Sequence, residues 1–234
     1  MCSGNRMRIA SLIGYLQHHV QLTVVITGPA PNHIEEFLRR DYKAEFYVPE
    51  YEKYLNSNGY GKRLKAFLKD RHFDAIVIEY IHSSYFLNFL MKSDALIIFD
   101  AHDIISDRIN DFKKFDFQGA LFELTRESEF DMHNLYDYVK MLCVPDFEKI
   151  KLAIGANKIL LCPHPIIPFK HTTRKDVGNI VFIASAYLPN KDASYFFINN
   201  CWPGILLKYD VRLSIYGTVC DGLVIEGAPS CVVS

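Results

Sequence analysis

The sequence lacks several features that mark common classes of protein. Its 6 cysteines form no C-x-x-C pair, no apolar run is long enough to span a bilayer, and the first residues contain no apolar core of a secretory signal. These absences argue against a zinc-binding or disulfide-rich domain, a transmembrane protein and an exported protein. We therefore expect a cytoplasmic protein with reduced cysteines.

The sequence also lacks an excess of charge of either sign. Its 26 Lys and Arg residues nearly balance its 27 Asp and Glu residues, and the formal net charge is -1. No overall field attracts nucleic acid or an anionic membrane, and we expect no nucleic-acid partner. A local basic surface could still contact the inner face of a membrane. The residues that could form it are Arg39, Arg40, Lys43, Lys62, Arg63 and Lys65.

Several catalytic motifs are absent as well. The chain has no G-x-S-x-G nucleophile elbow, no P-loop and no complete G-x-G-x-x-G fingerprint. This disfavours serine hydrolases, kinase-like enzymes and dehydrogenases. There is no internal repeat, and a hydrophobic content of 50% is ample for the core of one large α/β domain or two smaller ones.

What the sequence does contain is an alternation of helical and strand patterns, which predicts an α/β fold with a parallel sheet. Strands are expected at residues 20–27, 44–48, 74–79, 95–99, 138–144, 159–162, 179–184 and 211–216. Helices are expected at residues 5–19, 32–40, 62–72, 85–91 and 119–136, from Pro145 onward, and at 193–201 and 202–208. Loops are expected at 49–61 and 104–114, and two short strands are expected in the tail after Gly217.

Prolines mark one boundary in the chain. The segment that begins with Pro163-His164-Pro165 can neither donate to a strand ladder nor continue a helix at its prolines. We expect a first domain over residues 1–164, a linker over 165–178 and a second domain over 179–234.

The strongest candidate site follows the strand at 95–99. This strand is apolar without alternation, which is typical of a strand covered on both faces of a parallel sheet. Asp100, His102 and Asp103 come directly after it, where ligands bind in open α/β sheets. The strand at 74–79 also ends in polar residues. A solvated loop with a helix cap would give the same composition.

His102 is the central residue of this candidate site. A histidine held by a carboxylate can act as a general base, an orienting donor or a metal ligand, and we expect Asp100 and Asp103 to support its ring. A metal site would need further ligands at set spacing, so no metal is expected.

Two helix starts are candidate anion sites. Gly4 and Asn5 are cap-type residues beside the guanidinium of Arg6, and backbone N–H groups at a helix start bind phosphate or carboxylate. Lys191 follows Asn190 at another helix start, after a strand and a turn. A structural cap and an exposed lysine are the commoner explanations of both patterns.

Taken in order, these motifs resemble the two-domain nucleotide-sugar glycosyltransferases of the GT-B type, specifically the large family four of retaining enzymes. The resemblance is carried by S-G-N-R-M-R-I-A-S-L at 3–12, F-D-A-H-D at 99–103 with the later Arg108, the helix and strand at 123–144, P-H-P at 163–165, I-V-F-I-A-S at 180–185, P-N-K at 189–191, W-P at 202–203 and L-S-I-Y-G at 213–217.

The resemblance implies a GT-B fold, with a Rossmann-like acceptor-side domain and the beginning of a Rossmann-like donor-binding domain. It implies sugar transfer from a nucleotide-diphosphate sugar to a glycan or lipid-linked acceptor in cell-surface polysaccharide or glycolipid assembly. His102 would face the transferred sugar. The residues it places at the donor diphosphate are Gly4, Asn5, Arg6, Asn190, Lys191 and Gly217. Cationic side chains and helix starts would stabilise the leaving diphosphate, so no metal or other cofactor is implied.

The resemblance also implies a chain truncated at both ends, because a strand normally precedes the glycine-rich loop and most of the second domain is missing. Without that first strand, two strands of the sheet would face a gap with unpaired N–H and C=O groups. Two other functions remain open at this point: a catalytically inactive remnant or binding module, and a GT-B sugar-nucleotide epimerase.

Overall fold

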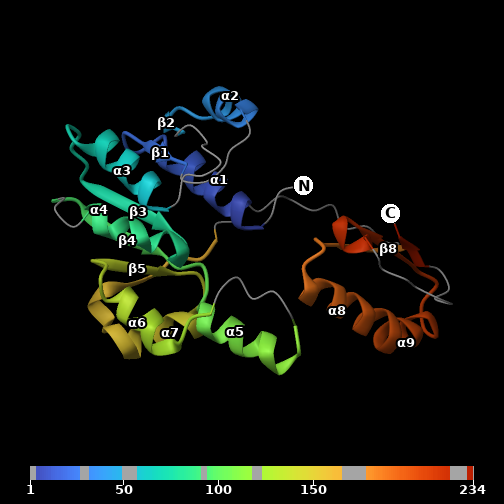
Figure 1. The fold of residues 1–234 in the computed structure, drawn as a ribbon. Helices are drawn as coiled ribbons and strands as arrows, with labels where there is room; N and C mark the ends of the chain where they lie inside the picture. The colour runs from blue at the N-terminus through green and yellow to red at the C-terminus, as the bar shows by residue number, and fades with distance from the viewer. Residues whose placement is uncertain are drawn as a thin grey trace. The chain divides into compact units, whose positions relative to one another are not determined.

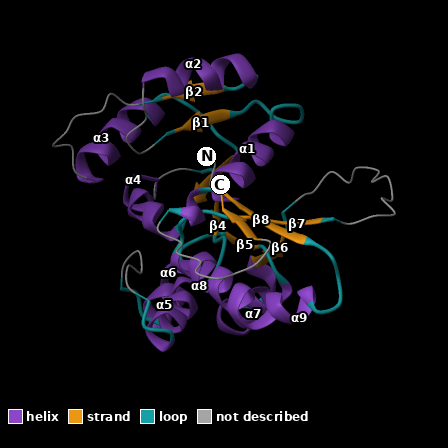
Figure 2. Ribbon diagram, turned by 90° about the vertical axis from the view of Figure 1, so that its right-hand side faces the viewer, coloured by secondary structure: helices purple, strands orange, loops and turns teal. Residues whose placement is uncertain are grey.

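The computed structural model describes residues 4–26, 32–48, 57–90, 94–117, 123–164, 178–221 and 231–233. The chain divides into two compact units, Gly4–Pro165 and Ile166–Ser234, called here the N-terminal and the C-terminal unit. Helices and strands alternate, and the strand pairs that the structure describes are parallel, as the sequence predicts (Figure 1, Figure 2). Apart from Gly178, the predicted linker lies outside the described residues.

The residues of the N-terminal unit that the structure describes form two separate sheets. Its elements are α1 (Gly4–Leu16), β1 (Thr23–Val25), α2 (Asn32–Asp41), β2 (Glu45–Tyr47), α3 (Ser57–Leu68), β3 (Ala75–Glu79), η1 (Ile81–Phe86), α4 (Leu87–Leu90), β4 (Leu96–Asp100), α5 (Ile105–Lys114), α6 (Arg126–His133), β5 (Tyr138–Met141), α7 (Val144–Ile154), η2 (Ala156–Lys158) and β6 (Ile159–Leu161). β1 pairs with β2, while β3, β4, β5 and β6 form a four-stranded sheet in that order. Among the described residues no pairing joins β1 to β3. The truncation at both ends stays a prediction.

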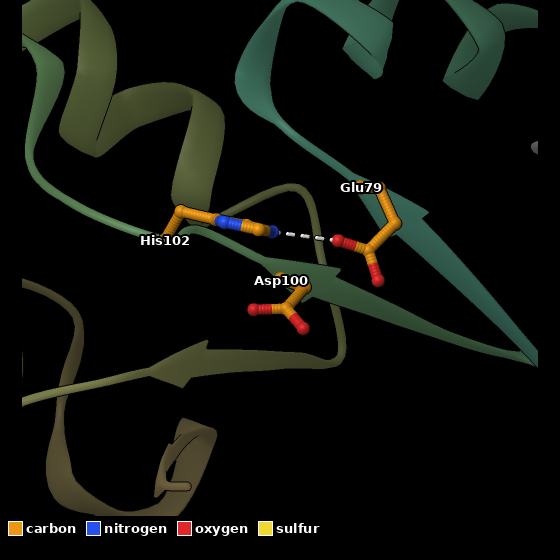
Figure 3. A group of neighbouring side chains, drawn as sticks. All are labelled: Glu79, Asp100 and His102. Carbon is orange, nitrogen blue, oxygen red and sulfur yellow. Dashed lines mark hydrogen bonds and ion pairs between the residues drawn. The ribbon is translucent and has the colours of Figure 1, made fainter. Parts of the chain in front are cut away.

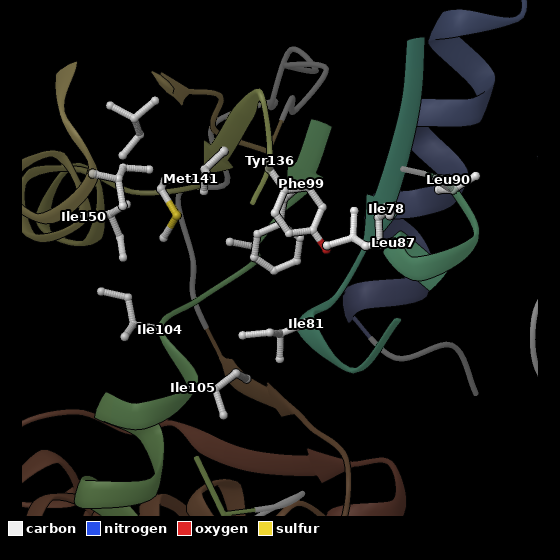
Figure 4. Packing of buried hydrophobic residues seen from close by; sticks show 14 of the residues in the cluster. Ile78, Ile81, Leu87, Leu90, Phe99, Ile104, Ile105, Tyr136, Met141 and Ile150 are labelled. Carbon is white, nitrogen blue, oxygen red and sulfur yellow. The ribbon is translucent and has the colours of Figure 1, made fainter. Parts of the chain in front are cut away.

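The main hydrophobic core lies on one face of the four-stranded sheet. In the register of the strands, Ile78, Phe99, Val139 and Ile159 lie side by side, and none of them is more than 6% exposed. Successive residues of a strand point to opposite faces, so this row defines the covered face. β5 adds Met141 to the core, and the helices and loops add further residues, which Figure 4 labels as Ile81, Leu87, Leu90, Ile104, Ile105, Tyr136 and Ile150.

β4 lies between β3 and β5, and Figure 1 shows the three strands side by side. The prediction that β4 is covered on both faces is wrong at Leu96, which is 48% exposed on the face opposite Phe99. An apolar composition indicates that a strand lies inside a sheet. Which of its side chains are covered depends on what packs on each face, and the pattern of β4 does not contain that information.

The segment 104–114, predicted as a loop, contains helix α5. Ile105 and Phe112 are buried two turns apart on this helix. The carboxylate of Glu129, on α6, accepts hydrogen bonds from the backbone N–H groups of Ile105 and Ser106 at 2.7 and 2.8 Å. These N–H groups lie in the first turn of α5 and have no hydrogen-bond partner within the helix. Burial raises the pKa of Glu129. Because this cap comes from a distant residue, no local cap marks the helix in the sequence.

Two other predicted boundaries also change. The helix predicted at 119–136 corresponds to the shorter α6, whose start is capped by the side chain of Thr125; residues 118–122 lie outside the described part. The loop predicted at 49–61 ends early, because α3 begins at Ser57. Asn and Ser are frequent both in turns and at helix starts, which explains the error.

The C-terminal unit contains one three-stranded parallel sheet in the order β7, β8, β9. Its elements are β7 (Asn179–Ile183), α8 (Leu188–Phe196), the π-helical turn η3 (Phe197–Cys201), α9 (Trp202–Leu206), β8 (Arg212–Tyr216), η4 (Thr218–Cys220) and β9 (Cys231–Val233). Trp202, Leu213 and Ile215 form the centre of its core and are at most 1% exposed. Of the two short strands expected in the tail, β9 is described, while residues 222–230 lie outside the described part.

Within the described ranges, no helix combines the length and the apolar character needed to cross a bilayer. The basic residues proposed for membrane contact lie on α2 and α3 or just after α2. Arg40 forms an ion pair with Asp41, and Arg39 donates a hydrogen bond to the carbonyl of Phe46. These two guanidinium groups are therefore engaged inside the unit, and membrane contact stays a prediction.

Candidate functional site

Charged residues lie in a row across the C-terminal ends of three strands. Glu79 on β3 is opposite Asp100 on β4, and Asp100 is opposite Lys140 on β5. Residues at one register level of parallel strands point to one face, and this face is the one opposite Phe99. The polar cluster predicted after β4 therefore exists, but it is built from three strands.

Asp100 is completely buried and is held by two cations. Nη2 of Arg8 lies 2.7 and 2.8 Å from its two carboxylate oxygens, and Nζ of Lys140 lies 2.5 Å from Oδ2. The side chains of Arg8 and Lys140 are 8% and 12% exposed. A buried carboxylate without such partners would cost several kcal/mol. Because Arg8 belongs to α1, the ion pair fixes this helix to the end of β4.

His102 is held by Glu79. Its Nε2 lies 2.7 Å from Oε2 of Glu79, and Figure 3 draws this contact as the interaction that joins these two side chains beside Asp100. The prediction that Asp100 and Asp103 hold the ring is therefore corrected. Asp100 pairs with Arg8, as described above, and Asp103 accepts hydrogen bonds from the guanidinium of Arg108, with Nε at 2.8 Å.

The backbone at the ends of β3 and β4 has unusual conformations. Tyr80 and His102 have φ angles of 67° and 56°, in a region that non-glycine residues rarely adopt. A hydrogen bond of 2.6 Å from the N–H of Asp103 to the carbonyl of Ala101 closes the turn around His102. The Tyr80 and His102 rings stack with centroids 4.1 Å apart. Strained residues that packing holds in place are common at functional sites, so this pair marks the cluster as a candidate.

The pairing with Glu79 determines what His102 can offer a ligand. An ionised carboxylate only accepts hydrogen bonds, so Nε2 of His102 carries the proton in the neutral ring and Nδ1 carries the lone pair. Among the described residues, the hydrogen bond that the structure gives the His102 ring is the one between Nε2 and Glu79. His102 can therefore accept a hydrogen bond, or a proton, from a hydroxyl group.

The cluster is also the group of described residues that could hold a metal ion, because ligand atoms of Glu79, Asp100 and His102 lie within 4.8 Å of one another. Asp100, however, already has two cationic partners, Arg8 and Lys140. A divalent cation would sit beside these positive charges, and the carboxylate it needs is already neutralised. The donor set therefore fits an ion-pair network better than a metal site, and the expectation of no metal remains a prediction.

Three of the predicted diphosphate residues belong to α1. Gly4, Asn5 and Arg6 form its first turn, and the side chains of Asn5 and Arg6 lie outside the described part. Arg8, one turn after Gly4, contacts Asp100. The start of α1 therefore lies at the same edge of the sheet as His102.

Sequence reasoning missed Arg8, Lys140 and Glu79 as members of the cluster. Arg8 stands among apolar residues at helical spacing, and Lys140 stands inside a strand that is otherwise apolar or aromatic. A charged residue among apolar residues is rarely buried without a partner of opposite charge. The positions of Arg8 and Lys140 in the sequence could therefore have indicated that each of them forms an ion pair. Glu79 was visible as the polar end of a buried strand.

Two further predicted residues lie at the start of α8, in the C-terminal unit. The side-chain amide of Asn190 donates to the carbonyl and hydroxyl oxygens of Ser185 at 3.3 and 3.2 Å. Nζ of Lys191 donates to the carbonyl of Asp221 at 2.6 Å, which brings the loops after β7 and β8 together. The structure thus gives both residues a structural contact, and their role toward a diphosphate stays a prediction.

Gly217, at the end of β8, has a φ of 104°, and a Cβ atom there would lie 2.3 Å from the carbonyl oxygen of Ala184. We expect Gly217→Ala to destabilise the C-terminal unit by roughly 2 kcal/mol or more, from backbone strain and overpacking together. Urea unfolding followed by the fluorescence of Trp202, the single tryptophan of the chain, reports on this unit. Gly204→Ala is the control, because its Cβ meets nothing within 4 Å; an equal loss in both variants would contradict the close approach.

No protein-family model matches the sequence, and no curated protein matches it. Among solved structures, the chain resembles a UDP-glucosyltransferase from Polygonum tinctorium capable of glucosylating indoxyl, in a complex with 3,4-dichloroaniline. The likeness has a TM-score of 0.55 at 12% sequence identity, and it covers 99% of this chain and 69% of that chain. Such a likeness shows the fold: the chain has a glycosyltransferase-like α/β fold with parallel Rossmann-like sheets.

Proposed function

We propose that this protein transfers a sugar from a nucleotide-diphosphate sugar to a hydroxyl group of a glycan or lipid-linked acceptor, in the assembly of cell-surface polysaccharide or glycolipid. The observation that carries the proposal is the His102–Glu79 pair at the C-terminal edge of the sheet, in a chain with a glycosyltransferase-like fold. The cytoplasm or the inner face of a membrane is the proposed location.

The proposed reaction needs little covalent chemistry from the protein. The acceptor oxygen forms a bond to the anomeric carbon of the sugar, while the bond from this carbon to the diphosphate oxygen breaks. The electron pair of the broken bond leaves with the nucleoside diphosphate, and the proton of the acceptor hydroxyl moves to a base. Cationic groups and helix starts can stabilise the leaving diphosphate without a metal ion. We assign this task to Lys191, at the start of α8.

His102 is assigned to a hydroxyl group through the lone pair of Nδ1, with Glu79 fixing the tautomer and the orientation of the ring. In a retaining transfer, which the sequence resemblance implies, this hydroxyl belongs to the transferred sugar, and the acceptor proton goes to the leaving diphosphate. The anomeric configuration of the product tests this assignment. Inversion would instead assign His102 to the acceptor hydroxyl as a general base.

Binding of the donor can be tested without any acceptor. We expect nucleoside diphosphates to stabilise the protein in a thermal-shift experiment, by about 2.7 kcal/mol at a hundred times their Kd. Lys191→Ala is expected to reduce this shift, whereas Lys208→Ala, at an exposed position of the same unit, should leave it unchanged.

Each alternative predicts a different result of the same experiments. A catalytically inactive remnant predicts no shift with any nucleoside diphosphate at millimolar concentration, and that outcome would contradict the transferase proposal. An epimerase predicts a changed sugar nucleotide in the absence of acceptor, which analysis of the products detects.

A further inference from the structure

His133, the last residue of α6, is completely buried, and its ring lies among aromatic side chains. The centroid of its ring is 5.2 Å from that of Phe99, on β4, and 6.0 Å from that of Phe130. Both ring nitrogens are buried, and among the described residues neither has a hydrogen-bond partner. A charged imidazolium at this position would lose its hydration and gain no counter-charge. The packed structure therefore keeps the ring of His133 neutral.

The titratable and charged groups around His133 are engaged with other partners. These pairs are Glu129 of α6 with the N–H groups of Ile105 and Ser106, Tyr136 with Ser84, Asp103 with Arg108, Asp107 of α5 with Arg126 of α6 and Lys149 of α7, Lys158 with the carbonyls of Asn134 and Tyr136, and Asp100 of β4 with Arg8 and Lys140 on the other face of the sheet. Lys158 places a positive charge near the end of α6, which further disfavours an imidazolium there.

Protonation of His133 is therefore linked to opening of this part of the core. Burial lowers the pKa of His133 to about 4, whereas a histidine exposed by opening has a pKa of about 6.5. The opened state binds the proton more strongly, so acid favours opening as the pH falls from about 6.5 to about 4. Glu129 has the opposite effect. Burial raises its pKa, so its protonation favours the closed state in acid.

An opening of α6 reaches the candidate site through Glu129. This residue lies one turn before His133, and its carboxylate holds the N–H groups of Ile105 and Ser106 in the first turn of α5. Ile105 is three residues after His102. If α6 leaves the core, Glu129 leaves the first turn of α5, and the chain that carries His102 loses this contact.

We propose that His133 makes α6 an acid-sensitive switch: protonation of the buried ring releases the end of α6 from the core, and Glu129 then releases the start of α5 beside His102. The switch keeps the candidate site ordered at neutral pH and loosens it in acid. It does not depend on the reaction that the protein catalyses.

Amide hydrogen exchange of the full chain, corrected for the intrinsic rate at each pH, measures this opening segment by segment. Between pH 7 and pH 5 we expect the opening equilibrium constant of α6 and of the first turn of α5 to rise about 20-fold. His133→Phe keeps an aromatic ring that cannot take a proton, so the rise should be less than roughly threefold. His72→Phe is the matched control, because the side chain of His72 is 81% exposed, and this variant should keep the full rise.

The same rise in His133→Phe as in the unmodified protein would overturn the proposal, because acid would then act through other groups. Opening of α6 without any change at the start of α5 would overturn the connection through Glu129.

A second measurement needs no variant, and it decides the question if His133→Phe does not fold. Hydrogen exchange at the ring Cε1 of His133, followed by mass spectrometry in the unmodified protein, gives the pH at which the ring titrates. We expect a midpoint below pH 5, as the burial of both ring nitrogens requires. A midpoint near pH 6.5, the ordinary value for histidine, would overturn the proposal.

Discussion

Replacing His102 by alanine is expected to lower kcat for sugar transfer by roughly a hundredfold or more, with a small change in KM. The reason is that Nδ1 of His102, oriented by Glu79 and by the Tyr80 ring, is the polar atom assigned to a reacting hydroxyl. The loss of one hydrogen bond should reduce the free energy of unfolding by only about 1 kcal/mol. Steady-state kinetics and urea unfolding of the same preparation separate the two effects.

Two further variants sharpen this experiment. His72→Ala removes a histidine whose side chain is 81% exposed, and it should leave kcat unchanged. Glu79→Gln removes the carboxylate that fixes the tautomer, so it should lower kcat while keeping the size of the side chain. A His102→Ala protein that is unstable but turns over normally would mean that His102 is only a packing residue.

Replacing Asp100 by asparagine is expected to cost about 3–5 kcal/mol of unfolding free energy, because it leaves Arg8 and Lys140 buried without a counter-charge. The measurement is urea unfolding followed by far-ultraviolet circular dichroism. Trp202 fluorescence serves as an internal reference, because this residue lies in the C-terminal unit. The loss of unfolding free energy should appear in the urea transition that is followed by circular dichroism.

Asp41→Asn is the matched control for the Asp100 variant. Asp41 pairs with Arg40 on the surface, with side chains 36% and 70% exposed, and ion pairs that are open to solvent contribute little to stability. Similar losses of unfolding free energy in the two variants would show that the buried ion pairs of Asp100 contribute no more to stability than the surface pair of Asp41. A stability of Asp100→Asn equal to that of the unmodified protein would contradict the network outright.

The sequence predicted those parts of the fold that depend on local pattern. The apolar run of β4 predicted a strand inside a parallel sheet, and the alternation of elements predicted the α/β class. Errors occurred where a distant residue decides the structure. The start of α5 is stabilised by Glu129 from α6, and nothing near Ile105 in the sequence carries that information.

The candidate site was predicted in position but not in composition. His102 does lie at the end of β4, because a polar residue after a buried strand is a local signal. Its partner Glu79 and the cations on Asp100 come from other elements, and only the strand register brings Glu79, Asp100 and Lys140 to one level of the sheet. The sequence therefore led to the assignment of Asp100 and Asp103, the nearest carboxylates in sequence, as partners of the His102 ring. The carboxylate that contacts the ring in the structure is that of Glu79.

The most direct test of sugar transfer is to incubate the 234-residue chain with nucleotide-diphosphate sugars and an acceptor alcohol, and to measure both products by mass spectrometry. We expect nucleoside diphosphate and glycoside to form in equal amounts, and both to fall by roughly a hundredfold or more in His102→Ala. No glycoside with any donor, or equal glycoside formation by the unmodified protein and His102→Ala, would contradict the role assigned to the His102–Glu79 pair.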